Sequence, residues 1–223
     1  MIDRYSRLLE LSSFSKEKLS LLKSKNILIV GVGGVGQNIA TYLVTNGCEK
    51  LTIMDFDKVE ISNLNRQYLV SEEDIGQIKV IAVQKALMKK NKDAKIKVLG
   101  AKITHENASN FIKGFDFVID ATDNWESKLV ISNACHKCEI TLLHIGVDGY
   151  SGQYALLKNK SLENLFSSEI KKEKRDGVLG PMVSLISSLA ALLLISYIVG
   201  EQKETDILYS FDYHSSRLVE MKI

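Results

Sequence analysis

Residues 26–57 read NILIVGVGGVGQNIATYLVTNGCEKLTIMDFD, and this stretch decides the fold. The apolar run from Ile27 to Val30 predicts a buried parallel strand that ends where a glycine-rich turn begins. The turn has the Gly-x-Gly-x-x-Gly spacing of a Rossmann nucleotide-binding loop; its glycines are Gly31, Gly33, Gly34 and Gly36. Such glycines permit a tight turn, so that the helix predicted over 37–46 directs its N-terminal amides at a phosphate.

A second apolar run, from Leu51 to Met54, predicts the neighbouring strand and leads directly to Asp55 and Asp57. A carboxylate about 20 residues beyond the glycine turn is typical of a group that accepts hydrogen bonds from ribose hydroxyls. The stretch as a whole therefore predicts nucleotide binding, although it does not by itself identify the nucleotide.

Composition limits the classes of protein to consider. The chain has 223 residues, 45% of them hydrophobic, which is enough for one α/β domain with a sizeable core. A net charge of +2 is close to neutral and argues against a protein built mainly to bind nucleic acid. Its three cysteines form an odd set without a disulfide framework, and the polar N-terminus is unlike a signal peptide, so we expect a cytoplasmic protein.

Strands and helices alternate along most of the chain. Apolar runs predict core strands at 26–30, 50–54, 95–99, 117–120 and 141–145, and helices are predicted at 37–46, 78–91, 106–113 and 125–137. This alternation predicts an α/β fold with a doubly wound, mostly parallel, Rossmann-like sheet. Further strands at 150–157, 207–213 and 217–223 are expected to add antiparallel strands at the C-terminal end. We expect one domain over 1–223, with an N-terminal helical arm (1–24) and a flexible crossover loop (158–178).

The apolar segment from Val183 to Gly200 is near the minimum length for a bilayer span. Several serines interrupt it and form, together with an alanine, a stripe of small residues at helical spacing. A tightly packed core helix explains this pattern better than a membrane span, and we expect no membrane association.

Polar residues follow the predicted strands where a parallel sheet places its ligand crevice. Asp55, Arg66, Lys79 and Asp123 are expected to converge on the glycine turn. Two cations and an acid suited to Mg²⁺ are typical of a triphosphate site, since Mg²⁺ in such sites binds one or two carboxylates together with phosphate oxygens. Asp123 and Asn124 also have a simpler explanation as caps of the helix that follows, and Arg7, on the N-terminal helix, has one as a surface charge. Arg66, by contrast, has little reason to lie in its polar loop except to contact an anion.

In the order and spacing of its motifs the chain resembles the ThiF/MoeB/HesA family, relatives of the ubiquitin-activating enzymes. The matching segments, which span nearly the whole chain, are Arg4–Arg7, the glycine turn, Asp55–Asp57, Asn63–Gln67, Gly76–Lys79, Thr122–Asn124 and Gly177–Pro181. The resemblance implies an ATP-dependent adenylyltransferase that activates the C-terminal carboxylate of a small ubiquitin-like sulphur carrier, of thiamine or molybdopterin type, with release of pyrophosphate.

The resemblance also implies roles for single residues. Asp55 would bind the ribose, Asn63, Arg66 and Lys79 the triphosphate, and Asp123 the Mg²⁺. Arg7 would enter the active site of a partner subunit, which implies a homodimer. The remaining expected nucleotide contacts are Asp57, Gln67, Thr122 and Asn124. The expected protein partner is a carrier that ends in Gly-Gly.

The chain departs from the family at its cysteines. Many members bind a structural zinc through two Cys-x-x-Cys pairs, but no cysteine follows Cys138 here, so we expect no structural zinc. We interpret Cys135 and Cys138 as helix-packing thiols. His144 lies on an apolar strand near the crevice, where it could contact substrate, but a core histidine with satisfied hydrogen bonds is the simpler interpretation. Three alternatives stay open: an NAD(P)-dependent oxidoreductase, a non-catalytic scaffold, and a family member that acts on a tRNA base or a peptide terminus.

Overall fold

The structure is a computed structural model that describes residues 3–165 and 177–223. Its centre is an eight-stranded sheet with the order β3-β2-β1-β4-β5-β6-β7-β8. The charged run at 171–175, predicted as part of a flexible crossover loop, lies outside the described residues.

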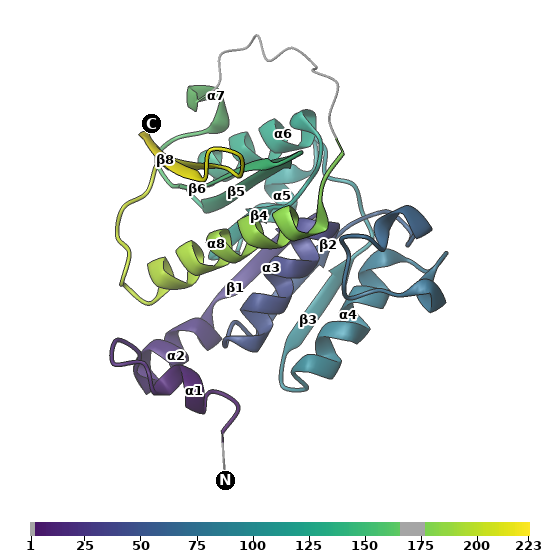
Figure 1. Ribbon diagram of the computed structural model, residues 1–223, viewed down its shortest axis with the longest axis horizontal. Coiled ribbons are helices and arrows are strands. Elements are labelled where there is room, and N and C mark those ends of the chain that lie inside the picture. The colour runs from purple at the N-terminus through teal and green to yellow at the C-terminus, as the bar shows by residue number, and fades with distance from the viewer. Residues whose placement is uncertain (1–2, 166–176) are drawn as a thin grey trace.

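The parallel half of the sheet confirms the predicted core strands (Figure 1). These strands are β1 (Asn26–Val30), β2 (Lys50–Met54), β3 (Lys95–Leu99), β4 (Phe117–Asp120) and β5 (Thr141–Asp148). Alternate residues of β1 point to opposite faces, so that Ile27 and Ile29 join one apolar cluster while Leu28 and Val30 join the other. A strand buried on both faces must be apolar throughout, which explains the continuous run in the sequence.

The antiparallel extension is also confirmed. It consists of β6 (Ser151–Leu157), β7 (Ile207–Asp212) and β8 (Arg217–Lys222), each antiparallel to its predecessor. The first of these strands follows β5 through a tight turn at Gly149, which has a φ of 52°. Strand β6 runs back alongside β5, and the tip of this hairpin extends past β4, whose pairing with β5 ends at Asp120 and His144.

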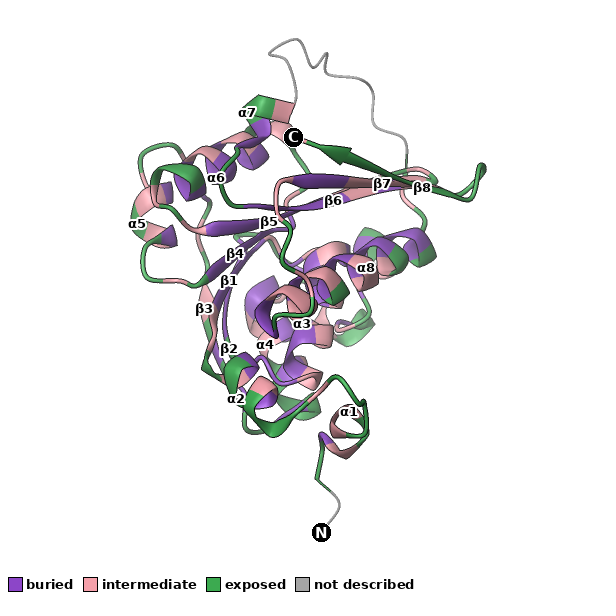
Figure 2. Cartoon of the chain, turned by 90° about the vertical axis from the view of Figure 1, so that its left-hand side faces the viewer, coloured by how far each residue is buried: buried purple, intermediate pink, exposed green. Residues whose placement is uncertain are grey.

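Helices cover both faces of the sheet (Figure 2). One face carries α3 (Gly34–Thr45), α4 (Lys79–Lys90) and α8 (Gly180–Ile198), and the other carries α5 (Ala108–Ile112), α6 (Trp125–Lys137) and the short α7 (Leu162–Leu165). The arm before β1 contains α1 (Ser6–Leu9) and α2 (Lys16–Ser24), and two 3₁₀ turns, Ile61–Asn63 and Glu72–Asp74, lie between β2 and α4. The arrangement is the predicted doubly wound fold.

Helix α8 is long and apolar enough to cross a membrane, with a mean hydropathy of 2.0. In the structure it lies along α3 and the strands β5 and β6, where Ile186, Ala190 and Leu194 are fully buried. Its small residues face α3, with Ser188 donating a hydrogen bond to the Tyr42 hydroxyl at 2.9 Å. Helix α8 is therefore a core helix of the fold, as the stripe of small residues predicted.

The glycine turn connects β1 to α3, and two of its glycines are required by the backbone. Gly31 has a φ of 90°, and a Cβ there would lie 2.7 Å from the Ala121 carbonyl oxygen. A Cβ at Gly36 would lie 2.0 Å from the Gly31 carbonyl oxygen. The helix begins at Gly34, not at Gln37 as predicted, because close packing of this first turn against β1 and β4 outweighs the low helix propensity of glycine.

Replacing Gly36 by alanine is expected to destabilise the protein. Alanine within a helix normally adds up to about 1 kcal/mol relative to glycine, but overpacking costs about 1–3 kcal/mol, and a 2.0 Å approach to a backbone oxygen allows little relief. Thermal unfolding of Gly36→Ala should therefore begin several degrees below wild type. The matched control is Gly100→Ala, since a Cβ at Gly100 meets nothing within 4 Å. Equal melting temperatures for the two variants would contradict this account of the turn.

Candidate functional site

A cavity of about 900 Å³ opens at the carboxyl end of the parallel strands. The glycine turn forms one wall, and the loops that follow β2 and β4 form two others. Arg66, Lys79 and Asp123 line this one cavity together with Gly33 and Asp55. The structure thus brings together residues that are up to 90 positions apart in the sequence, as Gly33 and Asp123 are.

Asp55 lies at the end of β2, beside the turn. Its two carboxylate oxygens accept hydrogen bonds from the Val32 amide at 2.8 Å and the Asp57 amide at 2.9 Å. These bonds fix the orientation of the carboxylate, yet each oxygen retains a lone pair. The geometry is suited to accepting hydrogen bonds from two neighbouring hydroxyls, which is the role predicted for Asp55.

Arg66 lies over the start of α3, where a Cβ on Gly34 would come within 3.1 Å of its Cγ. Its guanidinium is oriented by its own loop: Nη1 donates to the Ser62 carbonyl and to Asn65 Oδ1, each at 2.9 Å. Asn63 is buried below, and its carbonyl accepts the Arg66 amide at 3.1 Å. A cation is therefore held next to the helix N-terminus, where an anion is most stable.

A buried glutamine pair attaches this loop to the glycine turn. Gln37 donates to the Val32 carbonyl at 3.1 Å and to Gln67 Oε1 at 3.0 Å, while its own Oε1 accepts the Leu69 amide at 3.0 Å. Gln67 was predicted as a nucleotide contact and lines the cavity, but its side-chain oxygen is occupied by Gln37. The positioning role of Gln37 was missed, because nothing in the sequence links it to a loop 30 residues away.

Lys79 is the first residue of α4, and its side chain is only 6% exposed. The backbone of 57–59 pairs with that of 76–79, including a 3.0 Å bond from the Lys79 amide to the Asp57 carbonyl. This pairing brings the Lys79 ammonium to 3.2 Å from the Asp57 carboxylate, which is itself half exposed. A buried ammonium with one exposed counter-charge can turn to an incoming phosphate, because Asp57 can be solvated by water.

Asp123 and Asn124 have separate tasks. Asn124 is the N-cap of α6, since its Oδ1 accepts the Ser127 amide at 2.8 Å. Asp123 is exposed and, within 3–165 and 177–223, has no hydrogen bond or ion pair. An exposed carboxylate in the cavity, beside Lys79 and Arg66, fits the oxygen chemistry that Mg²⁺ requires when phosphate oxygens supply most of its ligands.

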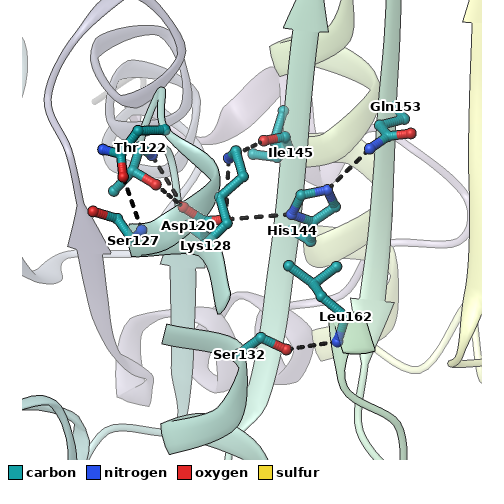
Figure 3. A network of polar contacts seen from close by, with 10 residues as sticks. Asp120, Thr122, Ser127, Lys128, Ser132, His144, Ile145, Gln153 and Leu162 are labelled. Atoms are coloured by element: carbon teal, nitrogen blue, oxygen red, sulfur yellow. Dashed lines mark hydrogen bonds and ion pairs between the residues drawn. The ribbon is translucent and has the colours of Figure 1, made fainter. Parts of the chain in front are cut away.

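Sequence reasoning missed a buried polar network behind Asp123 (Figure 3). Asp120, at the end of β4, is fully buried and pairs in register with His144 of β5. Its Oδ1 accepts the Thr122 amide at 3.1 Å and the Thr122 hydroxyl at 2.6 Å. Its Oδ2 lies 3.1 Å from Lys128 Nζ and 3.3 Å from His144 Nδ1. His144 is therefore a buried core histidine with its hydrogen bonds satisfied, as predicted, and Asp120 is the partner that the sequence did not identify.

The charge of Asp120 is stabilised by its partners. Burial alone raises the pKa of a carboxyl group, but the Lys128 ammonium and the hydrogen bonds from His144 and Thr122 outweigh burial and lower the pKa of Asp120 to about 2. The stability that this ionised group contributes is complete above its ordinary value of 3.8 and is lost as the pH falls towards 2. The network fixes the backbone at Thr122, the residue before Asp123.

Replacing Lys128 by methionine should strongly destabilise the protein. The Lys128 ammonium also donates to the Ile145 carbonyl at 2.7 Å, and its loss leaves a buried carboxylate without its cation. Breaking such a pair costs about 3–5 kcal/mol, which should lower the melting temperature by roughly 6–20 °C in a chain of this size. The control is Lys137→Met, an exposed lysine on the same helix. A Lys128→Met variant as stable as Lys137→Met would show that the pair is not needed.

Arg7, a predicted site residue, lies outside the cavity. Arg7 on α1 is 90% exposed in its side chain and pairs with Glu10 at 2.8 Å. The neighbouring Tyr5 donates to Glu49, at the amino end of β2, so α1 lies at the opposite edge of the sheet from the cavity. Arg7 therefore does not line the cavity of its own chain, and its role in a partner's site stays a prediction.

The cysteines belong to the core. Cys135 is buried in the apolar cluster under α6, and burial raises the pKa of its thiol, which disfavours a metal-binding thiolate. Cys138 is half buried at the end of the same helix. Within the described ranges, no three histidine, cysteine, aspartate or glutamate side chains are grouped as metal ligands.

Comparison with known proteins agrees with this geometry. The sequence model of the ThiF family matches residues 5–223. A sulfur carrier protein adenylyltransferase of Thermus thermophilus is 28% identical over 89% of this chain and 78% of its own length. A probable molybdopterin-synthase adenylyltransferase of Porphyra purpurea is 32% identical over 88% of this chain and 54% of its own length. The chain thus spans about half the length of some relatives.

Solved structures share the fold. The crystal structure of E. coli MccB with ATP superimposes with a TM-score of 0.88, at 19% identity, over 99% of this chain and 71% of that chain. The same protein has been crystallised with AMPCPP and MccA, and superimposes with a TM-score of 0.85. At this identity the likeness concerns the fold alone.

Proposed function

The chain belongs to the ThiF family, and on that premise we propose that it is an adenylyltransferase that uses ATP to activate the C-terminal carboxylate of a small ubiquitin-like sulphur carrier. The carrier would be of the thiamine or the molybdopterin type. The names of the relatives support the carrier, and the convergence of Arg66, Lys79 and Asp123 on one cavity supports the nucleotide.

The reaction would be attack by the carboxylate on the α-phosphorus, with pyrophosphate leaving. A carboxylate is already ionised at neutral pH, so the protein needs no general base. The residues of the chain would bind ATP and align it with the carboxylate. The glycine turn and the start of α3 would face the phosphates, and Asp55 would hold the ribose. Arg66 and Lys79 would lie beside the phosphates, where negative charge increases during the reaction. Asp123 would hold Mg²⁺, which would supply positive charge to the phosphates when bound.

The observation that carries the proposal is this convergence of two cations and an exposed acid. An NAD(P) oxidoreductase shares the glycine turn and Asp55 but has no use for Arg66, Lys79 and Asp123. We extend the proposal to a cytoplasmic homodimer in which Arg7 of each subunit, exposed and far from its own cavity, reaches the site of its partner.

The test is carrier-dependent ATP–pyrophosphate exchange. Purified protein is incubated with ATP, Mg²⁺, labelled pyrophosphate and, in separate reactions, recombinant carriers of the two types that end in Gly-Gly. One of them should stimulate the exchange, and a carrier that lacks its final glycine should not. A protein that binds ATP but responds to no carrier of either type would contradict the substrate assignment.

A further inference from the structure

The cavity extends beyond the predicted phosphate site along β5 and β6. Here it is lined by His144, Gly146 and Gln153, which share one face of the hairpin because His144 pairs with Ala155 and Gly146 with Gln153. None of the three belongs to the motifs that suggest nucleotide binding. Their arrangement determines which hydrogen bonds this end of the cavity can make.

The proton on the imidazole of His144 has one possible position. His144 is fully buried, and burial lowers its pKa more than the hydrogen bond with Asp120 raises it, so the ring is neutral and carries one proton. The ionised carboxylate of Asp120 can only accept, and it lies 3.3 Å from Nδ1. The proton is therefore on Nδ1, and Nε2 is an acceptor.

This tautomer fixes the amide of Gln153. Its Nε2 lies 3.3 Å from the acceptor Nε2 of His144, so the amide must donate from nitrogen, and its carbonyl oxygen is directed away from the histidine (Figure 3). No donor to this oxygen is found in the parts of the chain that the structure describes. Gln153 therefore offers the cavity an acceptor with a fixed direction.

Gly146 keeps the space that this amide needs. A Cβ at that position would lie 3.3 Å from Gln153 Cγ and 3.4 Å from its Nε2. Such contacts are tighter than usual, and any larger side chain would push the amide away from His144. Asp120 connects the same network to Thr122, so one buried carboxylate orients both the residue before Asp123 and, through His144, Gln153.

We propose that the carbonyl oxygen of Gln153 accepts a hydrogen bond from a peptide N–H close to the carboxylate that is adenylated, and that Asp120 and His144 are positioning residues for it. The proposal rests on the proposed function and adds to it a residue that recognises the substrate. An acceptor cannot bind a carboxylate but does bind an amide N–H. The site would thus select the C-terminus of a peptide or protein over an acid that lacks a nearby amide.

The first test measures KM values in the exchange assay with the carrier that stimulates wild type. Loss of a neutral hydrogen bond of about 1.4 kcal/mol corresponds to roughly tenfold, so Gln153→Met should raise the KM for the carrier about tenfold and leave the KM for ATP within about twofold. His144→Phe releases the amide and also removes the hydrogen bond to Asp120, and it should raise the carrier KM by a smaller factor, because the Gln153 oxygen is still present. Gln202→Met, a half-buried glutamine bonded to Tyr209 outside the cavity, is the control and should change neither KM.

The second test changes the carrier. Semisynthetic carriers in which the last or the second-last peptide bond is an ester lack one N–H each. One of them should show a roughly tenfold higher KM with wild type and no such increase with Gln153→Met. The inference would be overturned if the ester raised the KM equally in both proteins, or if Gln153→Met left the carrier KM unchanged. In either case, exchange by wild type would still uphold the proposed function. A wild-type protein that responds to no carrier overturns both.

Discussion

Replacing Asp123 by alanine should lower carrier-dependent ATP–pyrophosphate exchange by about 100- to 1,000-fold, the cost of removing one group that stabilises charge in a transition state. Asp123 is exposed and has no partner among the described residues, so its loss removes no structural contact. The melting temperature should therefore stay close to that of wild type. The residual activity should require a higher Mg²⁺ concentration, because the remaining ligands are phosphate oxygens and water.

The neighbouring residue provides the control. Asn124→Ala loses the cap of α6, a 2.8 Å bond to the Ser127 amide, and should lose about 1 kcal/mol of stability while its exchange activity falls less than about tenfold. We therefore expect opposite results for the two variants: Asp123→Ala should lose activity but not stability, and Asn124→Ala should lose stability but little activity. If Asp123→Ala were destabilised and its activity were unchanged, the residue would be structural and the proposed metal site would be wrong.

Replacing Lys79 by methionine should lower kcat/KM for ATP by about 100- to 1,000-fold. The ammonium is 6% exposed and its paired carboxylate is 52% exposed, so the methionine fills an apolar site while Asp57 turns to water. Because a buried charge is removed and not left unpaired, the loss of stability should be small compared with that of Lys128→Met.

Two comparison variants isolate the effect. Asp57→Asn removes the partner but keeps the cation, and should cost less than about tenfold, since an unpaired ammonium binds a phosphate at least as well. Lys85→Met changes an exposed lysine on the same helix and should leave kcat/KM unaltered. Similar losses in Asp57→Asn and Lys79→Met would instead indicate that the ion pair maintains the fold of the loop.

Local patterns in the sequence predict most of the fold. The parallel strands are continuous apolar runs because both of their faces are covered, and the glycine spacing marks the nucleotide turn. The start of α3 was misplaced by three residues, since glycine is a poor helix former. Close contacts nevertheless require glycine here, between Gly36 and the Gly31 carbonyl and between Gly34 and Arg66. A contact between distant segments outweighed the local preference.

The cavity was predicted less completely. Four of the residues at the cavity could be predicted because they lie in segments that follow strands, and the ends of parallel strands meet at one edge of the sheet. These residues are Asp55, Arg66, Lys79 and Asp123. The Asp120 network depends on the register between β4 and β5 and on Lys128 in the first turn of α6, neither of which periodicity specifies. One signal was present: an acid at the end of one apolar strand and a histidine within the next are candidates for a buried pair.

The central claim is that this cavity binds ATP together with Mg²⁺. Calorimetric titration of the purified protein with ATP and with NAD, each with Mg²⁺ and with EDTA, tests it most directly. We predict saturable binding of ATP that weakens in EDTA and in Asp123→Ala, together with much weaker binding of NAD. Tight binding of NAD that does not depend on metal, with ATP unable to displace it, would contradict the account.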